Sequence, residues 1–277
     1  NQLSQPEDVE IDSAGNIFIA DYRNNRIQVK NRETGRVSTF INITQPTNIH
    51  IDESNNLFVL TESGTVKKYN SSGEFISDVS TGTQWGAIGM YINPAGEIYT
   101  IARNDRKVWK TPSNSSVAQV LFEDSNLHFP NAIAVDGEGN VYISGQNQPV
   151  LKWDAANQTV STIIFQNPSR AMNINSRGNL VIALEGFSLE SRNSTINEYG
   201  LDGSLIRSIY TQDQTVDHYL GISGLTVTDT DDVYFTVGKD ANQSGTIWTD
   251  AEVLNDRVYY FQRTTAIDIL AGQLTGS

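Results

Sequence analysis

A short hairpin pattern recurs six times along these 277 residues, and it constrains the fold more than any other feature. Each copy is an alternating strand, a turn rich in Asp, Asn, Gly or Ser, and a second alternating strand; PNAIAVDGEGNVYIS, residues 130–144, is the clearest. The copies begin near residues 6, 46, 87, 130, 169 and 222. This spacing of about 40 residues, with one longer interval, indicates a repeat architecture.

Two further strands follow each hairpin, for example RIQVKN and VSTFIN after the first copy, and PVLKWD and TVSTIIF after the fourth. Four strands at this period are typical of a β-propeller blade, and a lone blade cannot bury both of its faces. No useful length of the chain has apolar residues at helical spacing. We therefore expect an all-β fold, a six-bladed β-propeller with four antiparallel strands per blade, as a single domain over residues 1–277.

The segment PEDVEIDSAGNIFIADYRNNRIQV, residues 6–29, resembles an NHL repeat. The fourth copy resembles the repeat as far as Ser144, and the third, fifth and sixth copies keep only fragments of it. The resemblance covers nearly the whole chain at the level of fold and implies a six-bladed propeller. It implies little about activity, because propellers host many unrelated functions.

The composition of the chain excludes several classes of binding partner and of chemistry. The net charge of −13 argues against nucleic acid and anionic membranes, since phosphate binding needs a basic surface. No apolar run reaches the length of about 18 residues that a membrane-spanning helix needs, so we expect no membrane insertion. The chain has no cysteine, which excludes disulfides, thiolate nucleophiles and Cys-ligated metals.

The ends of the chain raise a separate question. The first repeat begins with its innermost strand and the last ends with its outermost one, so no blade would combine both ends. Three interpretations stay open: one unit of a longer tandem protein, self-association through the chain ends, or the ragged termini of a monomer.

The first residue inside each predicted blade should lie on one face, around the central channel; these residues are Glu7, Thr47, Ile88, Asn131, Arg170 and Ser223. Calcium-dependent lactonases of the gluconolactonase and paraoxonase type are similar in being six-bladed, and they hold their ion with a first-blade carboxylate and later Asn and Asp residues. The resemblance implies that Glu7 and Asn131 could hold a divalent cation, with calcium the expected ion, because oxygen ligands suit it. A hydrolase of this type is the alternative function.

Two other kinds of enzyme site fit poorly. Zinc lyases of the peptide-amidating type, also NHL propellers, place three histidines at blade entrances, but His50, His128 and His218 do not occupy those positions here. GISGL, residues 221–225, lacks the spacing and the following helix of a nucleophile elbow. The acids of residues 136–140 and 229–232 are expected to close turns, and Asp21, Asn25 and Arg26 to tie adjacent strands within the repeat.

Binding requires fewer exactly placed groups than catalysis. Long segments at 185–195, 210–221 and 238–256 are predicted on the channel-mouth face, where recognition tends to reside. They bring aromatic side chains together with acids, and Trp85 joins them from the third blade entrance. The predicted partner-binding residues are Trp85, Phe187, Tyr210, Asp217, Tyr219, Trp248 and Asp250.

N-glycosylation motifs occur at Asn42, Asn70, Asn114, Asn157, Asn193 and Asn242. All six lie in predicted turns or connections, which suits glycan attachment on both faces of the rim. The first interpretation is therefore a secreted, extracellular, glycosylated propeller that is not an enzyme and needs no cofactor. It would bind a protein or glycan ligand, or serve as a unit of an extracellular assembly.

Overall fold

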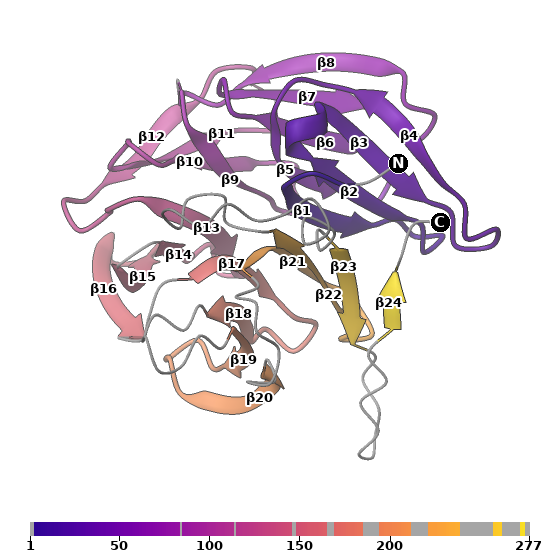
Figure 1. The fold of residues 1–277 in the computed structure, drawn as a ribbon. Coiled ribbons are helices and arrows are strands. Elements are labelled where there is room, and N and C mark those ends of the chain that lie inside the picture. The colour runs from indigo at the N-terminus through magenta and orange to yellow at the C-terminus, as the bar shows by residue number, and fades with distance from the viewer. Residues whose placement is uncertain are drawn as a thin grey trace, which may run out of the picture.

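The computed structural model describes residues 3–83, 85–113, 115–145, 148–164, 169–184, 194–211, 221–238, 257–261 and 272–274. These residues form six four-stranded antiparallel sheets, which stand radially around a common axis (Figure 1). The predicted all-β, six-bladed propeller is therefore confirmed; the sixth blade is described in part. No helix among these residues is long and apolar enough to cross a membrane.

In each blade the strands run in chain order from the inner to the outer edge. Blade 1 holds β1 (Pro6–Ile11), β2 (Ile17–Asp21), β3 (Arg26–Lys30) and β4 (Val37–Asn42), with the short 3-10 helix η1 (Tyr22–Asn24) between β2 and β3. Blade 2 holds β5 (Pro46–Ile51), β6 (Leu57–Thr61), β7 (Thr65–Tyr69) and β8 (Phe75–Ser80). Blade 3 holds β9 (Ala87–Ile92), β10 (Ile98–Ala102), β11 (Lys107–Thr111) and β12 (Gln119–Glu123).

The second half of the chain repeats this order. Blade 4 holds β13 (Pro130–Val135), β14 (Val141–Gly145), β15 (Gln148–Asp154) and β16 (Thr159–Ile164). Blade 5 holds β17 (Ser169–Ile174), β18 (Leu180–Leu184), β19 (Thr195–Tyr199) and β20 (Leu205–Thr211). Blade 6 holds β21 (Gly221–Val227), β22 (Val233–Gly238), β23 (Arg257–Phe261) and β24 (Gly272–Leu274).

Burial explains why the second strand of each blade is so apolar. Every residue of β2, β6, β10, β14 and β18 is buried, because neighbouring blades cover both faces of these strands. The outermost strands β4, β12 and β20 are instead mostly exposed or half-buried. The apolar core is correspondingly divided into clusters, each of which joins two adjacent blades, as Phe18 and Ala20 of blade 1 pack with Val59 of blade 2.

The hairpin turn between the first two strands has the same hydrogen-bonding scheme in blades 1, 2, 4 and 5. In blade 1, Asp12 Oδ1 accepts from the backbone N–H of Ala14 at 3.0 Å and of Asn16 at 2.8 Å. Asp136 does the same with Glu138 and Asn140, at 3.0 and 2.9 Å, which confirms that the acids of residues 136–140 close a turn.

The turn at 229–232 varies this scheme. Thr228 Oγ1 accepts from the backbone N–H of Asp232 at 3.1 Å, and Asp231 Oδ1 accepts from the Ser176 hydroxyl of blade 5 at 2.9 Å. The acids of this turn are structural, but Thr228 takes the position of the turn-closing acid and Asp231 connects blade 6 to blade 5, which differs from the prediction.

The buried Asp21 side chain connects strands within blade 1. Asp21 accepts from Arg26 Nε at 2.7 Å, and Asn25 Oδ1 accepts from the Gln45 backbone N–H at 2.9 Å, which links blade 1 to blade 2. The tie within the repeat is therefore confirmed for Asp21 and Arg26, whereas Asn25 connects its blade to the next one.

The ring closes by packing of blade 6 on blade 1, and each of these two sheets consists, among the described strands, of four consecutive strands of the chain. The Ser223 hydroxyl donates to the Pro6 carbonyl, and Thr226 Oγ1 donates to Glu10 Oε2 at 3.1 Å. Gly224 lies so close that a Cβ there would be 2.4 Å from Asp8 Cα and 2.7 Å from the Glu7 carbonyl oxygen. This close approach requires glycine at residue 224.

Gly224→Ala tests this seam. The added methyl group would meet backbone atoms, which cannot rotate away, so we expect a loss of about 1–3 kcal/mol in the free energy of unfolding. Thermal or urea unfolding measures it. Gly137→Ala is the matched control, because a Cβ at Gly137 meets nothing within 4 Å. Equal stability of the two variants would show that blades 1 and 6 do not approach in this way.

Candidate functional site

A β-bulge occurs at the same place in the innermost strand of every blade. In blade 1 Pro6 pairs with Asp21 and Asp8 with Ala20, so the register shifts at Glu7, and the same shift recurs in the other five inner strands. The bulged residues are Glu7, Thr47, Ile88, Asn131, Arg170 and Ser223. They are the residues predicted to surround the channel mouth, and bulges commonly redirect side chains near binding sites.

All six bulged residues line one central channel with a volume of about 2040 Å³. Glu7 and Asn131 therefore face the same space from blades 1 and 4. Glu7 Oε1 accepts from Gln5 Nε2 at 2.6 Å. Calcium takes six to eight oxygen ligands, and the described residues hold no group of three or more His, Asp or Glu side chains arranged for a metal. The calcium site at Glu7 and Asn131 stays a prediction.

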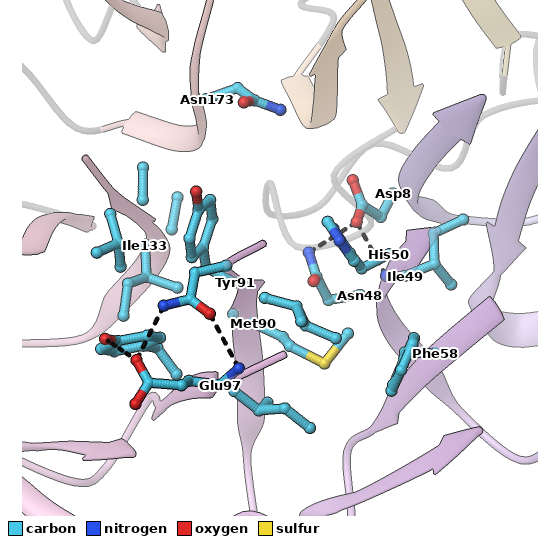
Figure 2. Close-up of a pocket in the computed structure, with 18 of the residues that line it drawn as sticks. Asp8, Asn48, Ile49, His50, Phe58, Met90, Tyr91, Glu97, Ile133 and Asn173 are labelled. Carbon is cyan, nitrogen blue, oxygen red and sulfur yellow. Dashed lines mark hydrogen bonds between the residues drawn. The ribbon is translucent and has the colours of Figure 1, made fainter. Parts of the chain in front are cut away.

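A polar cluster lies one step deeper in the channel, where blades 1, 2 and 6 meet. Asp8 Oδ2 accepts from Asn48 Nδ2 at 2.7 Å and from the Ile49 backbone N–H at 3.0 Å, so a blade 1 carboxyl satisfies the open edge of β5. Glu10 reaches both neighbours: Oε2 accepts from Thr226, and Oε1 lies 3.7 Å from His50 Nδ1. Figure 2 shows Asp8, Asn48 and His50 together at one side of the pocket.

Burial changes the acidity of these groups. Desolvation, together with repulsion from the nearby Asp8 carboxylate, raises the pKa of Glu10 to about 8. Desolvation likewise raises the pKa of Asp8 to about 7 and lowers the pKa of His50 to about 4. Two carboxyl groups and a neutral imidazole thus share a channel wall near neutral pH.

Sequence reasoning did not select Asp8 and Glu10, although the repeat contained the signal. The first inner strand reads PEDVEI where the fourth reads PNAIAV, so blade 1 has carboxyls at the positions of Ala132 and Ala134. Because the two strands have equivalent backbones, a charged pair at positions that tolerate alanine is not a requirement of the fold. His50, which is not at a zinc-lyase position, lines the channel.

The residue before the blade entrance has a left-handed backbone in four successive blades. Its φ is 52° at Gln5, 48° at Gln45, 86° at Gly86 and 48° at Phe129. Glycine adopts this conformation without penalty, but for a bulky side chain it costs about 1–2 kcal/mol. Phe129 is nevertheless 55% exposed, so burial of its ring does not explain the strain.

Two exposed aromatic residues stand at neighbouring blade entrances. Trp85, 69% exposed, directly precedes Gly86 at the start of blade 3, and Phe129 lines the channel at the start of blade 4. Trp85 had been predicted on this face; Phe129 had not. Its signal was a bulky residue directly before the entrance proline, where the first two copies have Gln.

Tyr210 was predicted in the segment 210–221 on the channel-mouth face, but the structure places it elsewhere. It lies in β20, the outermost strand of blade 5, and packs on Phe235 with ring centroids 5.5 Å apart. The predicted partner-binding residues Phe187, Asp217, Tyr219, Trp248 and Asp250 lie outside the described residues. So do His218 and the glycosylation candidates Asn114, Asn193 and Asn242.

The other glycosylation candidates have different environments. Asn42 at the end of β4 and Asn157 between β15 and β16 are exposed. Asn70 is half-buried, and its Nδ2 donates to Glu74 Oε2 at 2.7 Å while its Oδ1 closes the β7–β8 turn.

Comparisons with known proteins agree with the fold. Residues 3–29 match the family model of the NHL repeat, and the chain matches no curated protein. Virginiamycin B lyase from Staphylococcus aureus has a similar structure, with a TM-score of 0.65 and 12% sequence identity over 99% of this chain and 85% of the lyase. A gluconolactonase from Xanthomonas campestris has a TM-score of 0.67 and 13% identity, over 86% of this chain and 84% of that enzyme.

The extracellular domain of a one-component system from B. thetaiotaomicron is also similar, with a TM-score of 0.59 and 13% identity. The match covers 98% of this chain and 33% of that protein. At these levels of identity the similarity shows the propeller fold alone, and activity does not transfer with it.

Glu10→Gln tests the electrostatics of the cluster. The folded-state pKa of Glu10 is about 8, above the ordinary value of 4.5. The contribution of Glu10 to the free energy of unfolding is therefore fully present below about pH 4.5, where the carboxyl is protonated in both states, and it is lost as the pH rises through about 8. The amide cannot ionise. We therefore expect E10Q to exceed the parent by at least about 1 kcal/mol in stability above pH 8, and to match it near pH 4.

Unfolding curves across this pH range measure the difference. Glu53→Gln is the control, because Glu53 is an exposed residue of the β5–β6 turn and its removal should not alter the pH dependence. An E10Q variant less stable than the parent above pH 8 would contradict the view that desolvation disfavours the ionised form of Glu10.

Proposed function

We propose that this chain, a six-bladed β-propeller with an NHL repeat in its first blade, is an extracellular binding protein. Its partner, a protein or a glycan, would bind at the channel mouth on the blade-entry face. The observation that carries the proposal is the exposed pair Trp85 and Phe129 at the entrances of adjacent blades, above a large polar channel. Exposed aromatic anchors beside hydrogen-bonding groups are typical of recognition surfaces.

The backbone at Phe129 supports this proposal. An aromatic residue in a left-handed conformation is unfavourable, and the equivalent position of blade 3 has glycine. Strained residues persist where function requires them. A phenylalanine that is strained and mostly exposed stabilises neither the backbone nor the core, and it is suitably placed to contact a partner.

An extracellular setting is the second part of the proposal. Asn42 and Asn157 are exposed glycosylation motifs at opposite ends of their blades, so attached glycans would border both faces. The Asn70 amide group, which is engaged in its turn, is a poorer acceptor. Intact mass of natively expressed protein, before and after glycosidase treatment, tests this part, and an unchanged mass would contradict it.

Phe129→Gly separates a binding role from a structural one. Glycine relieves the left-handed strain, so we expect the variant to be as stable as the parent or up to about 1 kcal/mol more stable. If the ring instead holds its own loop, the variant should lose stability. Thermal unfolding decides between the two roles, with Gln45→Gly as the control at the same left-handed position of blade 2.

The same variant tests recognition. On glycan and peptide arrays, ligands of the parent chain should lose at least about tenfold in affinity with F129G or Trp85→Ala. They should bind Q45G normally. Ligands that are unaffected by both aromatic changes would place the binding surface elsewhere.

A metal-dependent hydrolase is the second candidate, because Glu7 and Asn131 occupy equivalent bulges and face one channel. The similar structures include an enzyme named as a gluconolactonase. In such a hydrolase these two residues would provide a carboxylate and an amide oxygen to a cation, which would polarise a lactone or ester carbonyl.

Metal analysis with Glu7→Ala decides this second candidate. A hydrolase should hold about one equivalent of calcium, lose it in E7A, and hydrolyse a lactone or ester only when the metal is bound. From the sparse ligand set we expect no stoichiometric calcium and no turnover. Bound calcium that E7A abolishes, with lactone turnover, would make the hydrolase the correct interpretation.

A further inference from the structure

We propose that the channel contains a binding site for a small organic ammonium ion, held by Asp8 and Glu10 where blades 1, 2 and 6 meet. The site lies inside the channel, deeper than the bulged residues of the mouth. It does not depend on the partner proposed for Trp85 and Phe129, and a ligand could occupy it with or without that partner.

The first argument is the supply of hydrogen-bond acceptors. Asp8 is only 6% exposed, yet it lines the channel together with Glu10. Asp8 Oδ2 is engaged by Asn48 and Ile49 of blade 2. The Asp8 carboxyl also accepts from the backbone N–H of its neighbour Val9, and no charged donor reaches it within the described part of the chain. On the wall beside it, Asn48 Oδ1 is buried without a donor. An ammonium ion brings the N–H donors that such a wall lacks.

The second argument is the absence of a compensating cation among the described residues. No Lys or Arg there forms an ion pair with Asp8 or Glu10. Lys68 and Lys110, which also line the channel, are already paired with Asp52 at 3.6 Å and with Glu97 at 2.8 Å. Arg103 and Arg170 line the channel as well, and neither forms an ion pair with Asp8 or Glu10. A carboxylate removed from water needs a partner or else takes up a proton, as the raised pKa values of Asp8 and Glu10 indicate. A cationic ligand would provide that partner and hold both groups in the ionised form.

The other groups that face the pair do not replace such a ligand. On β1 the nearest is Glu7, another carboxylate, which adds repulsion. From β5 comes His50, whose pKa falls to about 4 on burial, so its imidazole is neutral. β21 contributes the uncharged Thr226. Tyr91 of β9 lines the same channel and offers an aromatic ring, to which a cation is attracted.

The third argument distinguishes an organic cation from a metal ion. A metal would need several ligands at one point, and the described residues hold no such group. The channel is far larger than an ion, and Met90, Ile133 and Met172 line it alongside the acids. Figure 2 shows Met90 and Ile133 beside the same open space as Asp8 and His50. Polar anchors on an apolar wall suit an amine with a hydrocarbon stem.

Calorimetric titration with n-butylammonium chloride tests the site, with 1-butanol as the uncharged analogue and ammonium chloride as the ion without a stem. We expect butylammonium to bind at least about tenfold more tightly than either, because only it satisfies both the acids and the apolar wall. Glu10→Gln and Asp8→Asn should each weaken it about tenfold or more, equal to about 1.4 kcal/mol. Melting curves verify that each variant is folded.

Glu53→Gln is the matched control, since it removes one charge from the channel lining away from the pair. It should change the affinity by less than about twofold, because a distant exposed charge is screened. Equal loss in E53Q and E10Q, or undetectable binding by the folded parent at millimolar amine, would overturn the proposal. F129G should bind the amine normally, so this result is independent of the partner at the mouth.

Discussion

The fold depends on the mutual burial of blade faces. A four-stranded sheet whose second strand is apolar on both sides is unstable alone, and each blade here is covered by two neighbours. The apolar clusters therefore lie between blades and not within them. The innermost strands are held at the same radius by this packing, and their free edges enclose the channel. The site exists because the core has this arrangement.

The six blades have equivalent backbones but different side chains, and this difference separates the residues that the fold requires from those that serve a function. The bulge, the turn and the left-handed entrance residue recur from blade to blade, so the ring needs them. Asp8, Glu10 and Phe129 occupy recurring positions with side chains that those positions do not require. Each has an energetic cost, either desolvation of a carboxyl or backbone strain. A ligand in the channel and a partner at its mouth would offset these two costs.

The period and alternation of the repeat predicted the architecture, the blade entrances and the turn acids, because these features repeat and each copy supports the others. Asp8 and Glu10 were overlooked, since their significance depends on contacts with Asn48, His50 and Thr226, which are distant in sequence. Tyr210 was assigned to a loop because its position in an outer strand is decided by packing on Phe235. The alternation of apolar residues in the sequence predicts the face of a sheet on which a residue lies. The contacts between residues of different blades are known only from the closed ring.

The central claim is that the first and last blades meet beside the channel and complete the acidic cluster. Because the chain has no cysteine, the double variant Glu10→Cys, Thr226→Cys tests it directly with a short thiol-specific linker. The two native side chains approach within 3.1 Å, so the account predicts one intramolecular cross-link, seen as a single mass addition with both thiols consumed. Two thiols that react separately, with a linker attached to each, would show that blade 6 does not close the ring against blade 1.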